Sequence, residues 1–164
     1  AVYDLPTEVC MTINNYWGIH NGDPDHKSVR HLIRCLARGA SVGANYLLNV
    51  GPTAEGEILP LHAERLRAVG AWLKVNGESI YATRAGIIPA TRESVSTQGG
   101  DTHYVHVLDY VSDCVTLTGV PEAITHARLL GNSASIPLER HGDKTILTLP
   151  EAVRDPFDTV LVLR

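Results

Sequence analysis

The chain has 164 residues, a hydrophobic fraction of 44%, a charged fraction of 20% and a formal net charge of −4. These values are typical of a globular protein of one ordinary domain or two small ones. They give no reason to expect nucleic acid or an anionic membrane as partner, and no apolar run approaches the ~20 residues that cross a bilayer.

Three cysteines, Cys10, Cys35 and Cys114, are widely spaced and contain no CxxC pair. We interpret them as reduced, mostly buried thiols, because apolar or β-forming residues flank each of them. This pattern weakly favours a reducing compartment.

The first half of the sequence alternates between strand and helix patterns. Residues 10–16 (CMTINNY) carry β-forming side chains, and a polar loop follows over residues 19–27. Ser28 is a natural N-cap, after which apolar residues recur at helical spacing up to Ala40. Residues 46–50 (YLLNV) predict a second strand; it is apolar almost throughout, as strands buried on both faces of a parallel sheet are.

A Gly/Pro-rich loop over residues 51–59 leads to a second predicted helix. Pro60 stands where a first-turn proline is tolerated, and Gly77 can end the helix. Two β/α units in succession predict an α/β layer. Because two units alone leave sheet edges and apolar faces uncovered, we expect strands of another chain, or self-association, to cover them.

The pattern changes after Arg84. Short runs of alternating apolar residues, separated by turn signals, are typical of an antiparallel β-sandwich. The predicted strands cover residues 104–108, 115–117, 128–130, 145–149 and 160–163. We place a boundary near residues 84–90, which gives an α/β domain over residues 1–86 and an all-β domain over residues 87–164.

Three sequence blocks of the first half resemble a known family. Residues 8–18 (EVCMTINNYWG) are similar to the E-x-C-M-T-I-N-x-x-W-G block of the α-L-fucosidases of glycoside hydrolase family 29. Residues 41–58 resemble that family's S-x-G-G-N-x-L-L-N-x-G-P-x-x-D-G-x-I block, and residues 66–81 its L-x-x-x-G-x-W-L-x-x-N-G-E-x-I-Y block. The blocks stand in the family's order and spacing, whereas residues after Arg84 match only by type.

The resemblance implies a retaining exo-glycosidase that removes terminal α-L-fucose from fucosylated glycans, without a cofactor. The implied fold is α/β plus all-β: the last β/α units of a (β/α)8-type barrel, then a small antiparallel β-sandwich. In this family the nucleophile, and usually the acid/base, precede the segment that begins with Ala1. An upstream barrel half is therefore the expected partner, and the chain alone is expected to be inactive. A non-catalytic carbohydrate-binding or assembly module is the alternative function.

Candidate site residues follow from the carboxyl ends of the barrel strands, where such enzymes bind substrate. Fucose has an apolar methyl group and an apolar ring face, which Tyr16 or Trp17 would suit; packing of the barrel end is the alternative role of Trp17. Asn49 could bind the sugar or brace a loop, and His20 lies in the same rim segment. Glu8 is a candidate acid/base, with a structural or sugar-orienting role as the alternative.

Other polar groups carry weaker signals. His103 and His106 are three residues apart in a predicted strand, which points them to opposite faces and disfavours a metal pair. Asp23 and Asp25 are more typical of solvated turn residues than of a calcium site.

Overall fold

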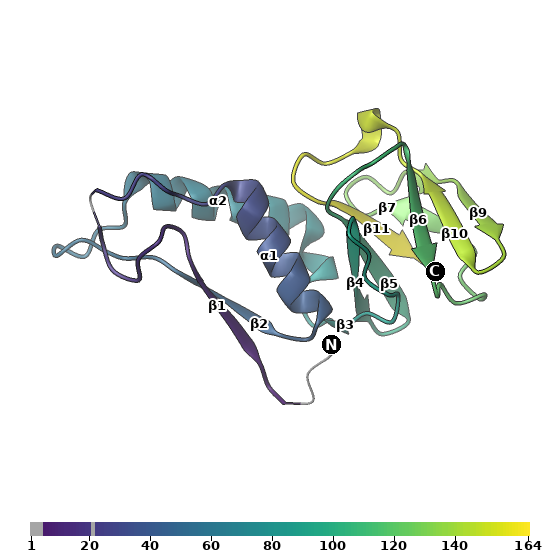
Figure 1. The fold of residues 1–164 in the computed structure, drawn as a ribbon, viewed down its shortest axis with the longest axis horizontal. Coiled ribbons are helices and arrows are strands. Elements are labelled where there is room, and N and C mark those ends of the chain that lie inside the picture. Colours follow the sequence, from purple (N-terminus) through teal and green to yellow (C-terminus); the bar gives the residue numbers. More distant parts are fainter. Residues whose placement is uncertain (1–4, 21) are drawn as a thin grey trace.

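The computed structural model describes residues 5–20 and 22–164 (Figure 1). The elements in chain order are β1 (Glu8–Thr12), α1 (Val29–Ser41), β2 (Asn45–Asn49), α2 (Pro60–Asn76), the 3-10 turn η1 (Gly77–Ser79), β3 (Arg84–Ala85), β4 (Ser94–Gly99), β5 (Thr102–Val107), β6 (Cys114–Thr118), β7 (Ala127–Leu129), β8 (Ser135–Ile136), β9 (Leu138–His141), β10 (Lys144–Thr148), the 3-10 turn η2 (Glu151–Val153) and β11 (Thr159–Leu163). Within the described ranges, no helix has the length and apolar character needed to cross a membrane.

The strands β1 and β2 form a parallel pair, in register from Glu8 opposite Asn45 to Thr12 opposite Asn49. Both predicted helices are confirmed: the Ser28 side chain accepts a hydrogen bond from the His31 amide at the start of α1, and a proline opens α2. The first strand ends earlier than predicted, because the chain turns after Thr12 and packs against the polar loop.

One face of the β1–β2 pair carries the helices α1 and α2, and the other face is uncovered (Figure 1). Leu47 on the uncovered face is 41% exposed. Cys10 lies on the same face and is exposed, as is Cys114 in β6, whereas Cys35 is half-buried. The prediction of mostly buried thiols is therefore wrong, since flanking residues do not reveal which side of a strand a neighbouring layer covers.

The second half forms the predicted antiparallel β-sandwich. One sheet has six strands in the order β3-β4-β5-β11-β7-β8, and the other has three in the order β6-β10-β9. Their facing side chains form the larger core, made by Ile88, Val105, Val107, Val115, Leu117, Val120, Ile124, Ala127, Leu129, Ile136, Leu147, Leu149, Leu161 and Leu163. The short strands β3, β8 and β9 and the polar strand β4 are additions to the predicted set.

The six-stranded sheet is covered on both faces. Alternate residues of β5 and β11 point to opposite sides: Val105 and Leu161 face the smaller sheet, whereas Tyr104, Val160 and Val162 pack with the helices in a second core. Figure 1 shows this order of layers, with the helices on one side of the sheet and the small sheet on the other.

A buried polar chain joins the helical layer to the sandwich. His106 Nδ1 and Asp158 Oδ2 are 2.7 Å apart, and both side chains are fully buried. Burial raises the pKa of the Asp158 carboxyl. The other ring nitrogen of His106 is 3.4 Å from Thr97 Oγ1, which donates to the Ser79 carbonyl at 2.6 Å. Trp72 Nε1 in α2 donates to the Asp158 carbonyl at 3.4 Å.

Candidate functional site

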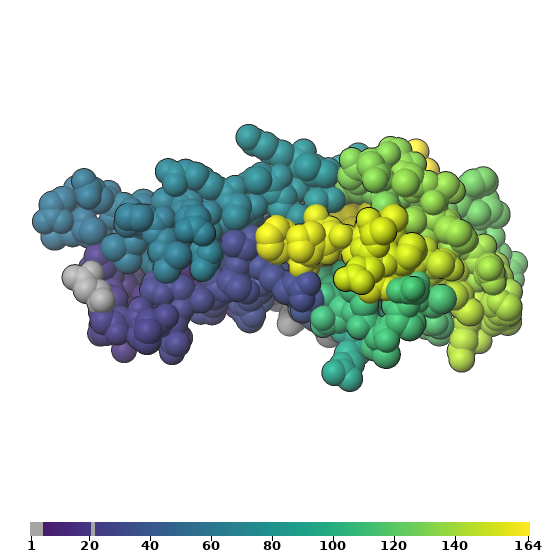
Figure 2. All heavy atoms as spheres, turned by 90° about the horizontal axis from the view of Figure 1, so that it is seen from above, coloured from purple at the N-terminus to yellow at the C-terminus, as the bar shows by residue number. Residues whose placement is uncertain are grey.

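The candidate site is the rim formed by the two loops that follow β1 and β2, over the described residues 13–20 and 22–27 of the first loop and residues 50–59 of the second. Parallel strands end at the same edge, so these loops lie side by side. They occupy the end of the helical layer that is farthest from the sandwich (Figure 1), and the space-filling view shows the same separation between the blue first half and the green and yellow sandwich (Figure 2).

Close backbone contact holds the two rim loops together. A Cβ atom on Gly51 would lie 2.4 Å from the carbonyl carbon of Gly18, so only glycine allows this approach. Asn49 Nδ2 donates to the Trp17 carbonyl oxygen at 2.7 Å. The sequence allows Asn49 either to bind the sugar or to brace a loop, and this hydrogen bond corresponds to the loop-bracing role.

Three predicted rim residues present aromatic rings to solvent. The rings of Tyr16 and His20 are stacked, with centroids 4.2 Å apart and planes 8° from parallel. Tyr16 is 47% and Trp17 58% exposed. The structure therefore stacks Tyr16 on His20 and leaves Trp17, the next residue after Tyr16, exposed in the same loop. These side chains offer aromatic faces that could contact the apolar face of a sugar.

Asp23 organises the first rim loop. Its carboxylate accepts hydrogen bonds from the Asn15 amide at 2.8 Å and the Asp25 amide at 3.0 Å. These two hydrogen bonds, of which the one from Asn15 has the larger effect, hold the pKa of the Asp23 carboxyl below its usual value. Asp23 is thus a buried loop anchor, and the prediction of a solvated turn residue is wrong for it. Among the residues described, no three His, Cys, Asp or Glu side chains gather closely enough to hold a metal ion.

Sequence reasoning missed a histidine pair behind the rim. His62, in the first turn of α2, is 1% exposed, and its ring meets that of His26 edge-on with centroids 5.2 Å apart. Burial lowers the pKa of His62. Neither ring nitrogen of His62 has a hydrogen-bond partner among the described residues. The only sequence signal is its place, three residues after the rim loop.

Glu8 lies apart from the rim. It is the first residue of β1, whereas the rim begins beyond Thr12, the last residue of this strand. At about 3.3 Å per residue, the two ends of the strand are about 13 Å apart. The Cys10 thiol donates to Glu8 Oε1 at 3.2 Å, which raises the pKa of Cys10. The structure therefore does not bring Glu8 together with Tyr16, Trp17, His20 and Asn49.

Comparison with known proteins gives matches to one family. The family model described as alpha-L-fucosidase matches residues 2–78. An alpha-L-fucosidase of Branchiostoma floridae is 39% identical over 137 residues, which are 79% of this chain and 30% of that protein. The human tissue alpha-L-fucosidase is 32% identical over 157 residues, 90% of this chain and 34% of its own length.

Solved structures match almost the whole chain. Isoenzyme 1 of the alpha-L-fucosidase from Paenibacillus thiaminolyticus has a TM-score of 0.90 at 36% identity, covering 97% of this chain and 39% of that one. A GH29 alpha-L-fucosidase from Bacteroides thetaiotaomicron, trapped as a covalent intermediate, has a TM-score of 0.85 at 26% identity, covering 96% and 37%.

These relatives are glycoside hydrolases, and their similarity includes both the helical layer and the sandwich. The chain spans about a third of the length of the curated relatives that it matches. It belongs to the α-L-fucosidase family.

Proposed function

We propose that this chain supplies the carboxyl-terminal part of a retaining exo-α-L-fucosidase that hydrolyses terminal α-L-fucose from glycoconjugates. The observation that carries the proposal is the exposed aromatic surface of Tyr16, Trp17 and His20 at the carboxyl ends of a parallel strand pair. In a family of fucosidases, this is the place and the chemistry expected for a sugar site.

The uncovered face of the β1–β2 pair supports a larger barrel. Leu47 and Cys10 are exposed there, although the strands are covered on their helical side. In a (β/α)8-type barrel, such side chains fill the interior together with those of the other strands. An upstream barrel half is thus the partner that we propose, and self-association over the same face is the alternative.

Retention requires two carboxyl groups about 5–5.5 Å apart, one as nucleophile and one as acid/base. We assign the nucleophile, and with it the acid/base, to the upstream half. Asp23 in the rim is committed to two backbone amides, and Glu8 lies outside the rim, at the far end of β1. Asp25, Glu55 and Glu57 are the exposed carboxylates of the rim loops, and the assay of the chain alone tests whether any of them can replace the upstream pair. The chain's own residues then bind the sugar through Tyr16, Trp17 and His20.

The decisive experiment is an assay with 4-nitrophenyl α-L-fucoside. The chain is measured alone and after mixing with the amino-terminal two thirds of the Branchiostoma floridae fucosidase. We expect hydrolysis only in the mixture. Turnover by the chain alone would show that it holds a complete site and would refute the assignment of both carboxyl groups to the upstream half.

Substitution of the rim tests its part in the mixture. We expect Trp17→Ala to raise KM by about three- to tenfold, because an aromatic contact contributes about 0.5–1.5 kcal/mol beyond its buried area. His141→Ala, on the exposed strand β9 of the sandwich, is the matched control and should leave KM unchanged. An unchanged KM in Trp17→Ala would remove this side chain from the sugar site.

A sugar-binding or assembly module is the second candidate, favoured by the exposure of the aromatic rim in the chain by itself. It predicts that the chain binds methyl α-L-fucoside but that no mixture hydrolyses the aryl fucoside. Calorimetry with and without the upstream half separates this outcome from the first.

A further inference from the structure

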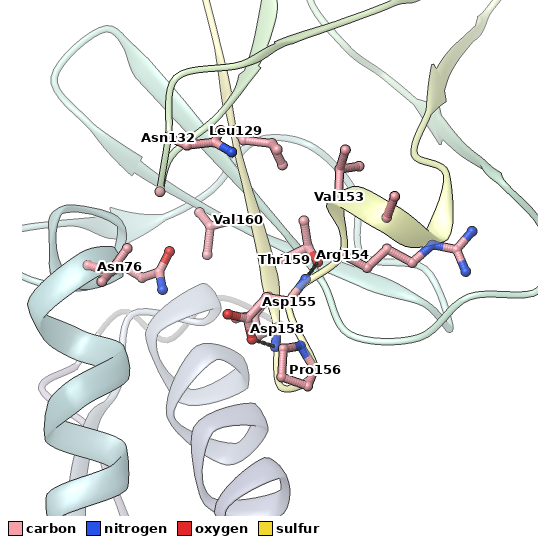
Figure 3. A pocket seen from close by; sticks show the side chains of 13 residues that line it. Asn76, Leu129, Asn132, Val153, Arg154, Asp155, Pro156, Asp158, Thr159 and Val160 are labelled. Carbon is pink, nitrogen blue, oxygen red and sulfur yellow. Dashed lines mark hydrogen bonds between the residues drawn. The ribbon is translucent and has the colours of Figure 1, made fainter.

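A second pocket lies at the junction between α2 and the sandwich (Figure 3). Its volume is about 310 Å³, which is at the lower limit of small-molecule sites. The end of α2, the turn after β7 and the segment between η2 and β11 line it. Since α2 has 17 residues and rises about 1.5 Å per residue, this junction pocket is about 25 Å along the helix from the rim.

One side of the junction pocket presents hydrogen-bond acceptors. Asp155 Oδ1 accepts from the amides of Phe157 at 2.8 Å and Asp158 at 3.2 Å. No described residue donates to the other oxygen of this carboxylate, which points toward Asn76 at the end of α2 (Figure 3). Asn76 Nδ2 donates to the Trp72 carbonyl at 3.2 Å, which leaves the side-chain oxygen of Asn76 as a further acceptor.

The opposite side of the junction pocket presents a donor. Asn132 Oδ1 accepts from the Ala134 amide at 3.0 Å, so the NH₂ group of Asn132 remains available to a ligand. The guanidinium of Arg154 extends away from the pocket (Figure 3) and lies 4.1 Å over the Tyr110 ring. Because the Asp158 carboxyl is paired with His106, Asp155 is the charged side chain that the pocket offers.

The remaining wall of the junction pocket is apolar. Leu129, Val153 and Val160 line it beside Val75. A neighbouring cavity of about 290 Å³ shares Val75, Asn76 and Asp155 with the junction pocket and extends to Trp72 and Phe157. The two cavities therefore adjoin at these shared residues, and we call them together the groove. Donors and acceptors line the junction pocket, and aromatic side chains line its neighbour.

We propose that the junction pocket binds one neutral sugar unit of a glycan, independently of the rim. Vicinal hydroxyl groups both donate and accept, which matches the acceptors Asp155 and Asn76 facing the donor Asn132. The branched aliphatic wall suits the apolar face of a pyranose ring, and one carboxylate disfavours acidic sugars. Such a site would hold a second part of a branched glycan while the rim engages its terminal residue.

The chain offers a separate reporter for each site, because its two tryptophans are Trp17 at the rim and Trp72 beside the groove. In ¹⁵N-tryptophan-labelled protein, the two indole N–H signals are followed during titration with methyl β-D-galactoside, methyl N-acetyl-β-D-glucosaminide and methyl α-L-fucoside. Butylamine is titrated in parallel, as a cation that would bind the Asp155 carboxylate without being a sugar. We expect a saturable shift of the Trp72 signal with at least one glycoside. No shift with any of the three glycosides, or a shift with butylamine alone, would overturn the proposal.

Two substitutions remove single ligand contacts while they preserve the local turns. Asp155→Asn keeps an oxygen for the two backbone amides, and Asn132→Asp keeps one for Ala134. Each should weaken glycoside binding in the junction pocket, as followed by the Trp72 signal, by about tenfold, because one hydrogen bond to a charged or polar group is lost. Asp143→Asn, in the exposed turn before β10, is the control and should bind as the wild type.

The outcomes distinguish this pocket from the proposed rim function. If the aryl fucoside assay fails, the proposed rim function is refuted, but the Trp72 titration still tests the junction pocket. If the glycosides shift only the Trp17 signal, the proposal for the junction pocket is refuted and the rim function is not. Wild-type affinity in both Asp155→Asn and Asn132→Asp would also overturn it. A Trp72 signal that keeps its wild-type position in the unliganded variants shows that the junction is intact.

Discussion

Replacing His106 by leucine tests the energetic weight of the buried pair at the junction. The change removes the partner 2.7 Å from Asp158 Oδ2 and leaves a fully buried carboxyl without a counterpart. Breaking such a pair destabilises a protein by about 3–5 kcal/mol. At about 2–4 °C per kcal/mol for a chain of this size, the Tm should fall by about 6–20 °C in a thermal unfolding experiment. Asp158→Asn keeps an acceptor for His106 and should cost only about 1–2 kcal/mol.

The pH dependence of the His106→Leu loss has a definite sign. Burial raises the pKa of the Asp158 carboxyl above its usual 3.8, whereas the charge and hydrogen bond of His106 lower it. Without His106 the pKa of the folded state rises further. A carboxyl whose pKa is raised by folding destabilises the protein above that pKa, and the penalty shrinks as the pH falls toward the unfolded value. The loss of stability should therefore be larger at pH 7.5 than at pH 5.

The exposed pair of His141 and Glu139 provides the matched control for His106→Leu. Its side chains are 61% and 67% exposed and 3.5 Å apart, so His141→Leu should change the unfolding free energy by no more than about 0.5 kcal/mol. If His106→Leu costs less than about 1 kcal/mol, or if its cost is the same at both pH values, the buried pair does not stabilise the junction.

Two further outcomes follow from local geometry. Gly51→Ala should destabilise the chain by about 1–3 kcal/mol, because the added methyl group contacts the opposing rim backbone. Gly70→Ala in α2 has nothing within 4 Å of its added methyl group and should stabilise the chain by about 0.5–1 kcal/mol. Urea unfolding measures both changes, and a change of the same sign in the two variants would contradict the geometry. Glu8 raises the pKa of the Cys10 thiol, so Glu8→Gln should speed the alkylation of Cys10 by iodoacetamide several-fold at pH 8. The alkylation rate of Cys114, followed by mass spectrometry in the same sample, should stay unchanged. An unaltered rate at Cys10 would show that the hydrogen bond from Cys10 to Glu8 has no effect on the thiol.

The helices and the apolar strands could be predicted from sequence because their patterns are local. Ser28 and Pro60 mark the helix starts in sequence and in structure. The strand β4 could not be predicted in this way, since residues 94–99 read SVSTQG and lack an apolar alternation. All six of its positions are nevertheless buried or nearly so. Its hydroxyls are satisfied by distant partners: Ser96 Oγ donates to the Ile88 carbonyl, and Thr97 Oγ1 to that of Ser79.

The candidate site shows the same division. The rim position of Tyr16, Trp17 and His20 follows from motif spacing and from the ends of parallel strands. The stacking of Tyr16 on His20, by contrast, depends on loop geometry that no spacing encodes. The pairing of His106 with Asp158 joins residues 52 positions apart, so the sequence predicted only that His106 would not share a metal with its neighbour on the strand.

The doubly covered sheet has a consequence for how this chain can be divided. A boundary near residues 84–90 separates two patterns of sequence, but the outer face of the six-stranded sheet carries Tyr104, Val160 and Val162, which pack against the helices of the other half. A sandwich expressed without those helices would present this apolar strip, and the ionisable His106 within it, to water. We therefore expect the two halves to unfold in a single cooperative step, and protease nicking between them to leave the fragments bound together.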